Sequence, residues 1–127
     1  MKSADDIRDV YKAYVTAMAE HDLDGVMAMF APQAVVHDPV DGPPRTGLEE
    51  IRQLFSAAIG SVRTCKLVSA VHVSGDCRHG AASVTAEVAM GDKVKVVDAA
   101  DFMTFDDDGR VTSLNVYWGP TNVHDNS

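Results

Sequence analysis

In Val35-Val36-His37-Asp38-Pro39-Val40-Asp41-Gly42 an apolar strand runs into a carboxylate immediately before a proline, and the rest of the chain is organised around this stretch. Proline disfavours the helical region for the residue before it, so Asp38 is expected to be held extended at the end of the strand. A carboxylate at the rim of whatever the strand encloses is suited to act as a general base. The same residues suit a polar turn, because Asp-Pro and Asp-Gly pairs are common in turns. Taken alone, the stretch fits the turn better.

Two helices are expected before this strand. Ser3, followed by two aspartates, is a favourable helix start, and apolar residues then recur at helical spacing: Ile7, Val10, Tyr11, Tyr14, Val15 and Met18. A first helix is therefore predicted over residues 4–20, with Tyr14 on its buried face, where core packing is its simplest role. Asp22 can cap a second, short helix that carries Phe30 on its apolar stripe and is stopped by Pro32. A strand is predicted over residues 34–38.

A third helix and a series of strands are expected after it. Thr46-Gly47-Leu48-Glu49 matches a capping box, and the helix that follows is predicted to end near Gly60. β-Branched runs come next, over residues 65–73, 81–90, 93–105 and 111–118, with hairpin turns at 91–92 and 106–109. This order predicts a single α+β domain over residues 1–127, with three helices packed on one face of a curved, mainly antiparallel sheet. The polar tail from Asn122 is expected to fray.

Two acids interrupt the apolar strand predicted over residues 93–105. Asp98 and Asp101 should point to opposite faces, and Asp101 shares its face with Met103 and Phe105 if the strand has no bulge. A carboxylate buried there without a cation would have a raised pKa, and its neutral form would be a hydrogen-bond donor. The alternative is that this face of the strand is solvated, and periodicity does not decide between the two.

Composition and charge disfavour several classes of protein. Hydrophobic residues make up 46% and charged residues 24% of the 127 residues, which is typical of a globular domain and not of a disordered chain. The net charge of −8, without a Lys/Arg cluster, opposes nucleic acid and anionic membranes as partners and suits a neutral or apolar small ligand. With no signal peptide and no apolar run near the roughly 18 residues of a membrane span, a soluble, cytoplasmic protein is expected.

Metal and nucleophile chemistry are not indicated by the residue spacing. The five histidines lack ligand spacing, and Cys65 and Cys77 are expected to be reduced thiols without a catalytic role. The sequence contains no Gly-rich phosphate loop and no nucleophile motif such as Gly-x-Ser-x-Gly. No metal or cofactor is therefore expected.

One set of motifs extends through nearly the whole chain. It comprises Tyr14-Val15, His21-Asp22-Leu23-Asp24-Gly25-Val26, Met29-Phe30-Ala31-Pro32, Val36-His37-Asp38-Pro39-Val40, Pro44-Arg45-Thr46-Gly47, Ile51-Arg52, Asp101-Phe102-Met103-Thr104-Phe105, Gly109-Arg110-Val111, Tyr117-Trp118 and Asn122. Together these motifs resemble the Δ5-3-ketosteroid isomerases (steroid Δ-isomerases) of the nuclear-transport-factor-2-like, or SnoaL-like, superfamily. Functions vary within this cone-shaped fold, so the combination of Tyr, Asp-Pro and strand Asp is the specific part of the likeness.

The resemblance implies an activity and its residues. Asp38 matches the family's general base, Tyr14 its phenolic oxyanion donor and Asp101 its protonated carboxylic-acid donor. That this acid is neutral in the folded protein is also implied by the resemblance. The implied reaction moves the double bond of a 3-oxo-Δ5-steroid to the Δ4 position by intramolecular proton transfer through a dienolate, without cofactor or metal. Relatives form homodimers through the outer sheet face, so a homodimer is expected.

The walls of the implied steroid cavity should be apolar. Candidates are Trp118, Met103, Phe55, Met90 and Phe102, and for each of them core packing is the other reading. The chain departs from the family at Phe30 and Phe55, where relatives often carry tyrosines, at least one of which bonds to the oxyanion tyrosine. The hydroxyl network around Tyr14 is therefore expected to be shorter.

Two other functions remain open at this level. One is a non-catalytic protein of the same fold that binds steroids or polycyclic ketones. The other is a related cyclase or epoxide hydrolase, although the Asp-Arg-Asp arrangement that such a hydrolase needs to activate water is not evident in the sequence.

Overall fold

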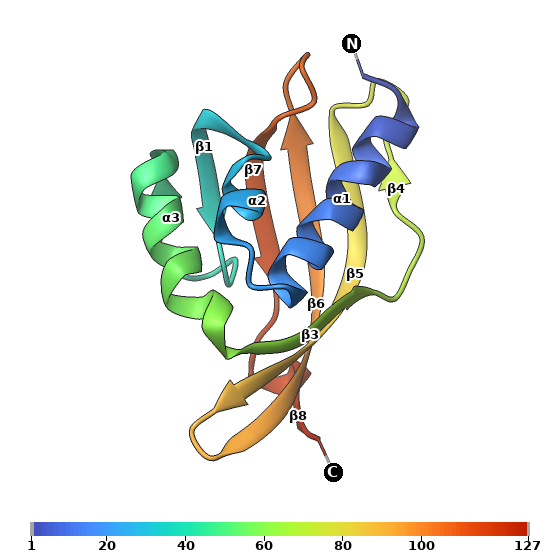
Figure 1. The fold of residues 1–127 in the computed structure, drawn as a ribbon. Coiled ribbons are helices and arrows are strands. Elements are labelled where there is room, and N and C mark those ends of the chain that lie inside the picture. The colour runs from blue at the N-terminus through green and yellow to red at the C-terminus, as the bar shows by residue number, and fades with distance from the viewer. Residues whose placement is uncertain (1, 127) are drawn as a thin grey trace.

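Three helices lie on one face of a curved sheet in the computed structural model, which describes residues 2–126 (Figure 1). The helices are α1 (Ala4–Ala19), α2 (Leu23–Met27) and α3 (Gly47–Ala58), with short 3₁₀ turns η1 (Ile59–Ser61) and η2 (Pro120–Asn122). The strands are β1 (Phe30–His37), β2 (Arg45–Thr46), β3 (Val62–Leu67), β4 (His72–Val73), β5 (His79–Met90), β6 (Lys93–Phe105), β7 (Val111–Tyr117) and β8 (Val123–Asp125).

The sheet is mixed but mostly antiparallel. Its order is β2-β1-β7-β6-β5-β3, with β4 added beside β5 and β8 beside β6. The β1–β7 pair is parallel and the other pairs within the described chain are antiparallel. The predicted α+β fold, with three helices on a curved, mainly antiparallel sheet, is therefore confirmed.

Helix α1 begins where the sequence predicts. The Ser3 hydroxyl accepts a bond from the Asp6 main-chain N–H at 3.2 Å, and the Asp6 carboxylate accepts one from the Ser3 main-chain N–H at 3.0 Å. This capping box satisfies main-chain donors that the first helical turn leaves free. The helix runs diagonally over the inner face of the sheet and buries its apolar stripe against that face (Figure 1).

The boundary between α2 and β1 differs from the prediction. The helix ends at Met27, and β1 begins at Phe30, so Pro32 lies inside a strand. The cause is pairing with a distant strand: Phe30 is in register with Val111, whose N–H donates to the carbonyl of Met29 at 2.8 Å. The ladder is irregular between Phe30 and Val35, and there the missing N–H of a proline costs little.

Two smaller predictions are also wrong. The N–H of Thr46 donates to the carboxylate of Glu50 at 2.9 Å, not to that of Glu49, and the Thr46 side chain makes no capping bond. The tail after Asn122 forms β8, which pairs with β6 opposite Lys95–Val97. Main-chain pairing thus holds a segment whose side chains are mostly polar.

The β5–β6 hairpin extends well beyond the rest of the sheet (Figure 1). Its two-residue turn holds Gly91 at a positive φ of 67°, which suits glycine, and pairs Met90 with Lys93. The hairpin and the helices together enclose the space in which the candidate site lies. Within residues 2–126 no helix is long and apolar enough to cross a membrane.

Candidate active site

A cavity of about 240 Å³ lies between the helices and the inner face of the sheet. Its walls are mostly apolar side chains, among them two methionines, together with the thiol of Cys65, the hydroxyl of Ser61 and four larger side chains that carry a polar group. The lining residues are Tyr14, Met18, Asp38, Leu54, Ala58, Ser61, Val62, Cys65, Val84, Ala86, Val88, Met90, Val97, Ala99, Asp101, Val116 and Trp118. None of these described residues carries a positive charge, so the two carboxylates face the cavity without a cation.

Asp38 stands at the end of β1, one residue beyond the strand. Its Oδ1 accepts a hydrogen bond from the indole Nε1 of Trp118 at 2.7 Å. Burial raises the pKa of Asp38, and the bond from Trp118 opposes that rise by stabilising the ionised form. One oxygen of the carboxylate is therefore held by an indole donor, in a cavity where a charged base is shielded from bulk water.

Asp101 points inward from the middle of β6. It shares the buried face with Met103 and Phe105, as the alternation predicts, and only 2% of its surface is exposed. Its Oδ1 has no hydrogen-bond partner among the described residues. Burial, and then the negative charge of Asp38, raise the pKa of Asp101 to about 7. A protonated Asp101 would be an unengaged acid that can donate a hydrogen bond into the cavity.

Tyr14 reaches the same cavity from α1. Burial raises its pKa well above the ordinary tyrosine value, and the charges of Asp101 and then Asp38 add to that effect. The phenol is therefore neutral and available as a donor. Its ring packs edge-on against Phe55, with centroids 6.3 Å apart, and Phe55 in turn lies 5.9 Å from Phe30. The two phenylalanines support the ring of Tyr14 but supply no hydroxyl to it.

The five predicted wall residues divide into three groups. Trp118 and Met90 line the cavity, whereas Phe55 and Met103 are buried in the core without lining it. Phe102 does not lie on the cavity wall: it is on the opposite face of β6, 43% exposed, with its ring 4.9 Å from that of Tyr117. Strand alternation explains this placement, because residue 102 must face away from residue 101.

Sequence reasoning missed most of the actual wall. The inner positions of β5 and β6 supply Val84, Ala86, Val88, Val97 and Ala99. The period-two pattern that places Asp101 also places these residues, so the signal was present in the sequence. Cys65 adds a thiol whose pKa is raised to about 12 by burial and then by Asp101, and which is therefore neutral.

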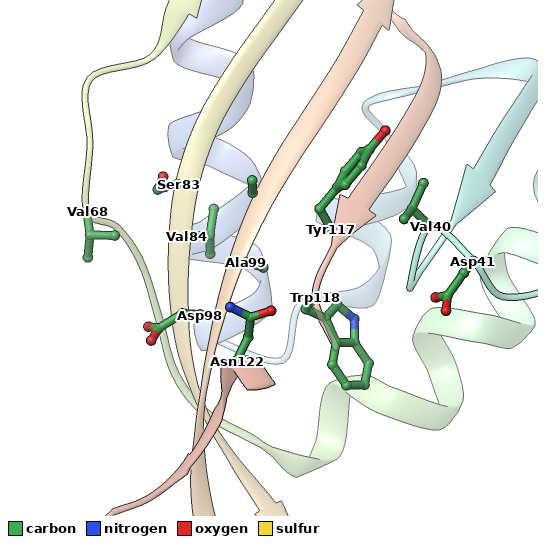
Figure 2. A pocket seen from close by; sticks show the side chains of 11 residues that line it. Val40, Asp41, Val68, Ser83, Val84, Asp98, Ala99, Tyr117, Trp118 and Asn122 are labelled. Atoms are coloured by element: carbon green, nitrogen blue, oxygen red, sulfur yellow. The ribbon is translucent and has the colours of Figure 1, made fainter. Parts of the chain in front are cut away.

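A larger hollow of about 720 Å³ lies beside this cavity (Figure 2). It shares Val84, Ala99 and Trp118 with the cavity, but neither Tyr14 nor Asp101 lines it. Its acids are Asp41 and Asp98, which the figure shows well apart. The cavity with the convergent polar groups is therefore the stronger candidate for chemistry.

The arrangement suits proton transfer. It combines a carboxylate that can accept a proton with two neutral donors that can stabilise a negative charge, in apolar surroundings where such bonds are strong. Within residues 2–126 no group of three or more His, Cys, Asp or Glu side chains is placed to hold a metal ion.

The fold and the site together define the class of protein. In this chain a layer of helices closes an apolar cavity on a curved sheet, and two carboxylates line that cavity. A family model described as a SnoaL-like domain matches residues 11–114. The chain belongs to this SnoaL-like, nuclear-transport-factor-2-like family.

Particular relatives are enzymes of two kinds. The chain is 30% identical to the steroid Delta-isomerase of Nocardioides simplex over 115 residues, 91% of each protein. It is 25% identical to the epoxide hydrolase LasB of Streptomyces lasalocidi, in an alignment that includes 91% of this chain and 48% of LasB. Among solved structures, SalBIII, an epoxide hydrolase/cyclase-like enzyme studied in pyran ring formation in polyether salinomycin, matches with a TM-score of 0.89 at 23% identity, over 98% of this chain and 99% of SalBIII. That structural match supports the fold.

Proposed function

We propose that this protein is a steroid Δ-isomerase, which converts 3-oxo-Δ5-steroids to the conjugated Δ4 ketones. The observation that carries the proposal is the buried carboxyl of Asp101, whose Oδ1 has no hydrogen-bond partner among the described residues, in one apolar cavity with Tyr14 and Asp38. Two neutral donors and one base are the groups that an enolising ketone needs. The 30% identical steroid Delta-isomerase supports the assignment.

The proposed reaction moves one proton and needs no other reactant. Asp38 removes a proton from C4 of the steroid, and the electrons of that C–H bond pass through the ring to the 3-keto oxygen, which gives a dienolate. Tyr14 and protonated Asp101 donate hydrogen bonds to this oxygen as its charge develops. Asp38 then returns the proton to C6, so the base is regenerated and the double bond is conjugated. Trp118 keeps Asp38 directed at the steroid face through its 2.7 Å bond.

The size of the cavity suggests how the steroid binds. About 240 Å³ is slightly less than the roughly 300 Å³ at the lower limit of typical small-molecule sites. We propose that the ketone end enters the cavity, while the remaining rings extend past Met90, which is 40% exposed and forms part of the wall. We also propose a homodimer through the outer sheet face, where Phe102 and Tyr117 form an exposed aromatic pair.

Two alternatives predict different results. A non-catalytic binding protein would keep the apolar cavity without turnover. An epoxide hydrolase is favoured by the 25% identity to LasB, but the described cavity wall contains no arginine with which to build an Asp-Arg-Asp water-activating group.

The test is the ultraviolet absorbance of the conjugated enone when the purified protein meets a 3-oxo-Δ5-steroid. Asp38→Asn should lower kcat by about 10²–10⁴-fold, the usual worth of a general base. Binding of a planar phenolic steroid should be retained or tightened, because the apolar cavity remains. Asp41→Asn is the matched control and should leave the rate unchanged.

Each other result has a clear meaning. If Asp38→Asn loses the phenolic steroid as well as turnover, Asp38 is a binding residue and its role as the base is refuted. If the wild-type protein binds the phenol but converts no steroid, the binding-protein alternative replaces the isomerase. Turnover of an epoxide with none of the steroid would establish the hydrolase.

A further inference from the structure

A second tyrosine of α1 is directed at the same strand as Tyr14 but lies outside the cavity. Tyr11 precedes Tyr14 by one helical turn, on the same buried face, and has no exposed surface. Its hydroxyl donates a hydrogen bond to the main-chain carbonyl of Asp101 at 3.1 Å, across 90 residues of sequence. Tyr11 therefore joins α1 to the main chain of Asp101. Tyr14, which is proposed to act with Asp101 as an oxyanion donor, lies on the next turn of the same helix.

The ring of Tyr11 is closely confined. A Cβ atom added at Gly80 would lie 2.8 Å from the ring carbon Cε2 of Tyr11 and 3.1 Å from its hydroxyl oxygen. The first distance is shorter than real Cβ atoms show and the second is tighter than most of their contacts, so a side chain at this position of β5 would force the phenol to shift. Phe105 packs edge-on against the ring, with centroids 6.5 Å apart. The hydroxyl is thus fixed beneath the main chain of β6.

The carboxyl of Asp101 depends on this main-chain anchor. Its Oδ1 has no partner, so no side-chain bond to that oxygen fixes its direction. The distance between this carboxyl and Tyr14 then depends on the β6 main chain and on the contacts that join β6 to α1. The bond from Tyr11 is such a link at residue 101 itself.

We propose that Tyr11 is a positioning residue, which holds Asp101 at the distance from Tyr14 that lets both groups donate to one oxyanion. This inference rests on the proposed function of the cavity. Loss of the Tyr11 hydroxyl should lower kcat by about tenfold and leave KM nearly unchanged, since a misplaced donor weakens transition-state stabilisation more than ground-state binding. Tyr11 does not line the cavity, so in this proposal it acts through the β6 main chain that carries Asp101.

The kinetic test combines Tyr11→Phe with the two donors. If Tyr11 acts through Asp101, Tyr11→Phe should have no further effect on kcat in an Asp101→Ala background, but should still lower kcat in a Tyr14→Phe background. Ile7→Val is the matched control, because Ile7 is fully buried on the same face of α1 and lies one turn from Tyr11. This control should leave kcat unchanged.

A second readout does not need turnover. The titration of the Asp101 carboxyl can be followed by carbon NMR of aspartate-labelled, ligand-free protein. Tyr11→Phe should move this titration toward the ordinary aspartate range, because a carboxyl that is free to tilt toward the cavity mouth regains water. Gly80→Ala places a methyl group against the ring of Tyr11 and should displace its hydroxyl. If Tyr11→Phe does not fold, Gly80→Ala takes its place in the test, and the titration should move in the same direction.

An Asp101 titration identical in the wild type and both variants overturns the inference, as does a loss of kcat that adds fully to that of Asp101→Ala. If the wild type does not isomerise steroids but Tyr11→Phe shifts the titration, the proposed function fails and the positioning role is upheld. The two failures are therefore distinguishable.

Discussion

Two aspartates of β6, three residues apart, have opposite environments. Asp98 is exposed on the outer side, where its carboxylate accepts a bond from the Thr85 hydroxyl at 3.0 Å and lies 3.1 Å from Nε2 of His124. Figure 2 shows it among the residues that line the larger hollow of about 720 Å³. Asp101 is buried on the inner side, and its Oδ1 has no partner.

The chemistry of these two aspartates is set by their surroundings more than by their residue type. On the solvated face, water and polar neighbours stabilise the carboxylate, so Asp98 behaves as a surface group. On the inner face, the helices and the hairpin exclude water, and Asp38 adds a negative charge, so the protonated form of Asp101 is favoured. Because the two residues are an odd number of positions apart along the strand, their side chains lie on opposite faces, and this is enough to separate their roles.

The largest expected difference between the two aspartates is in catalysis. Asp101→Ala should lower kcat for the steroid by about 10²–10³-fold, as expected for one lost oxyanion donor. Asp98→Ala should leave kcat within about twofold, because the outer face does not touch the reacting atoms. Steady-state kinetics on both variants measures the contrast. Equal losses in the two variants would show that the comparison reflects folding and not chemistry.

Stability should show the next largest difference. Since the folded pKa of Asp101 is raised, to about 7, the folded state binds more protons than the unfolded state between roughly pH 4 and 7. Its contribution is therefore fully present below the unfolded pKa and is lost as pH rises through the folded pKa. Asp101→Asn should raise the free energy of unfolding at pH 8 by roughly 2–4 kcal/mol relative to wild type.

Urea denaturation of wild type, Asp101→Asn and Asp98→Asn at several pH values provides the measurement. Burial also raises the pKa of Asp38, so Asp38 makes the free energy of unfolding change with pH in the same direction. All three proteins retain this contribution. The curve of Asp98→Asn should run parallel to the wild-type curve. A parallel curve for Asp101→Asn instead would mean that Asp101 is ionised in the fold at neutral pH.

The smallest expected effect concerns the outer pair itself. His124→Ala removes the imidazole next to Asp98, and both side chains are about half exposed. The free energy of unfolding should fall by no more than about 0.5 kcal/mol. High salt should reduce even this difference. A loss of several kcal/mol would show that β8, which carries His124, stabilises the hairpin far more than surface ion pairs usually do.

The predictions from sequence succeeded where local geometry decides. Ser3 caps α1 as predicted, with Asp6 completing the cap, and the turn at Gly91 joins the predicted hairpin. They failed at the local capping box of Thr46, and they failed where a distant partner decides. The start of β1 at Phe30 depends on pairing with Val111, and the order of the tail depends on pairing with β6.

The residue pattern alone places the two aspartates on opposite faces of β6, because side chains alternate along any strand. The environment of each face depends on how the whole chain packs. Packing of helices and hairpin removed water from Asp101, and brought Trp118 to Asp38 across 80 residues and Tyr11 to the Asp101 carbonyl across 90. Desolvation and hydrogen bonding depend on everything that surrounds a group, so they are properties of the packed chain and not of any segment.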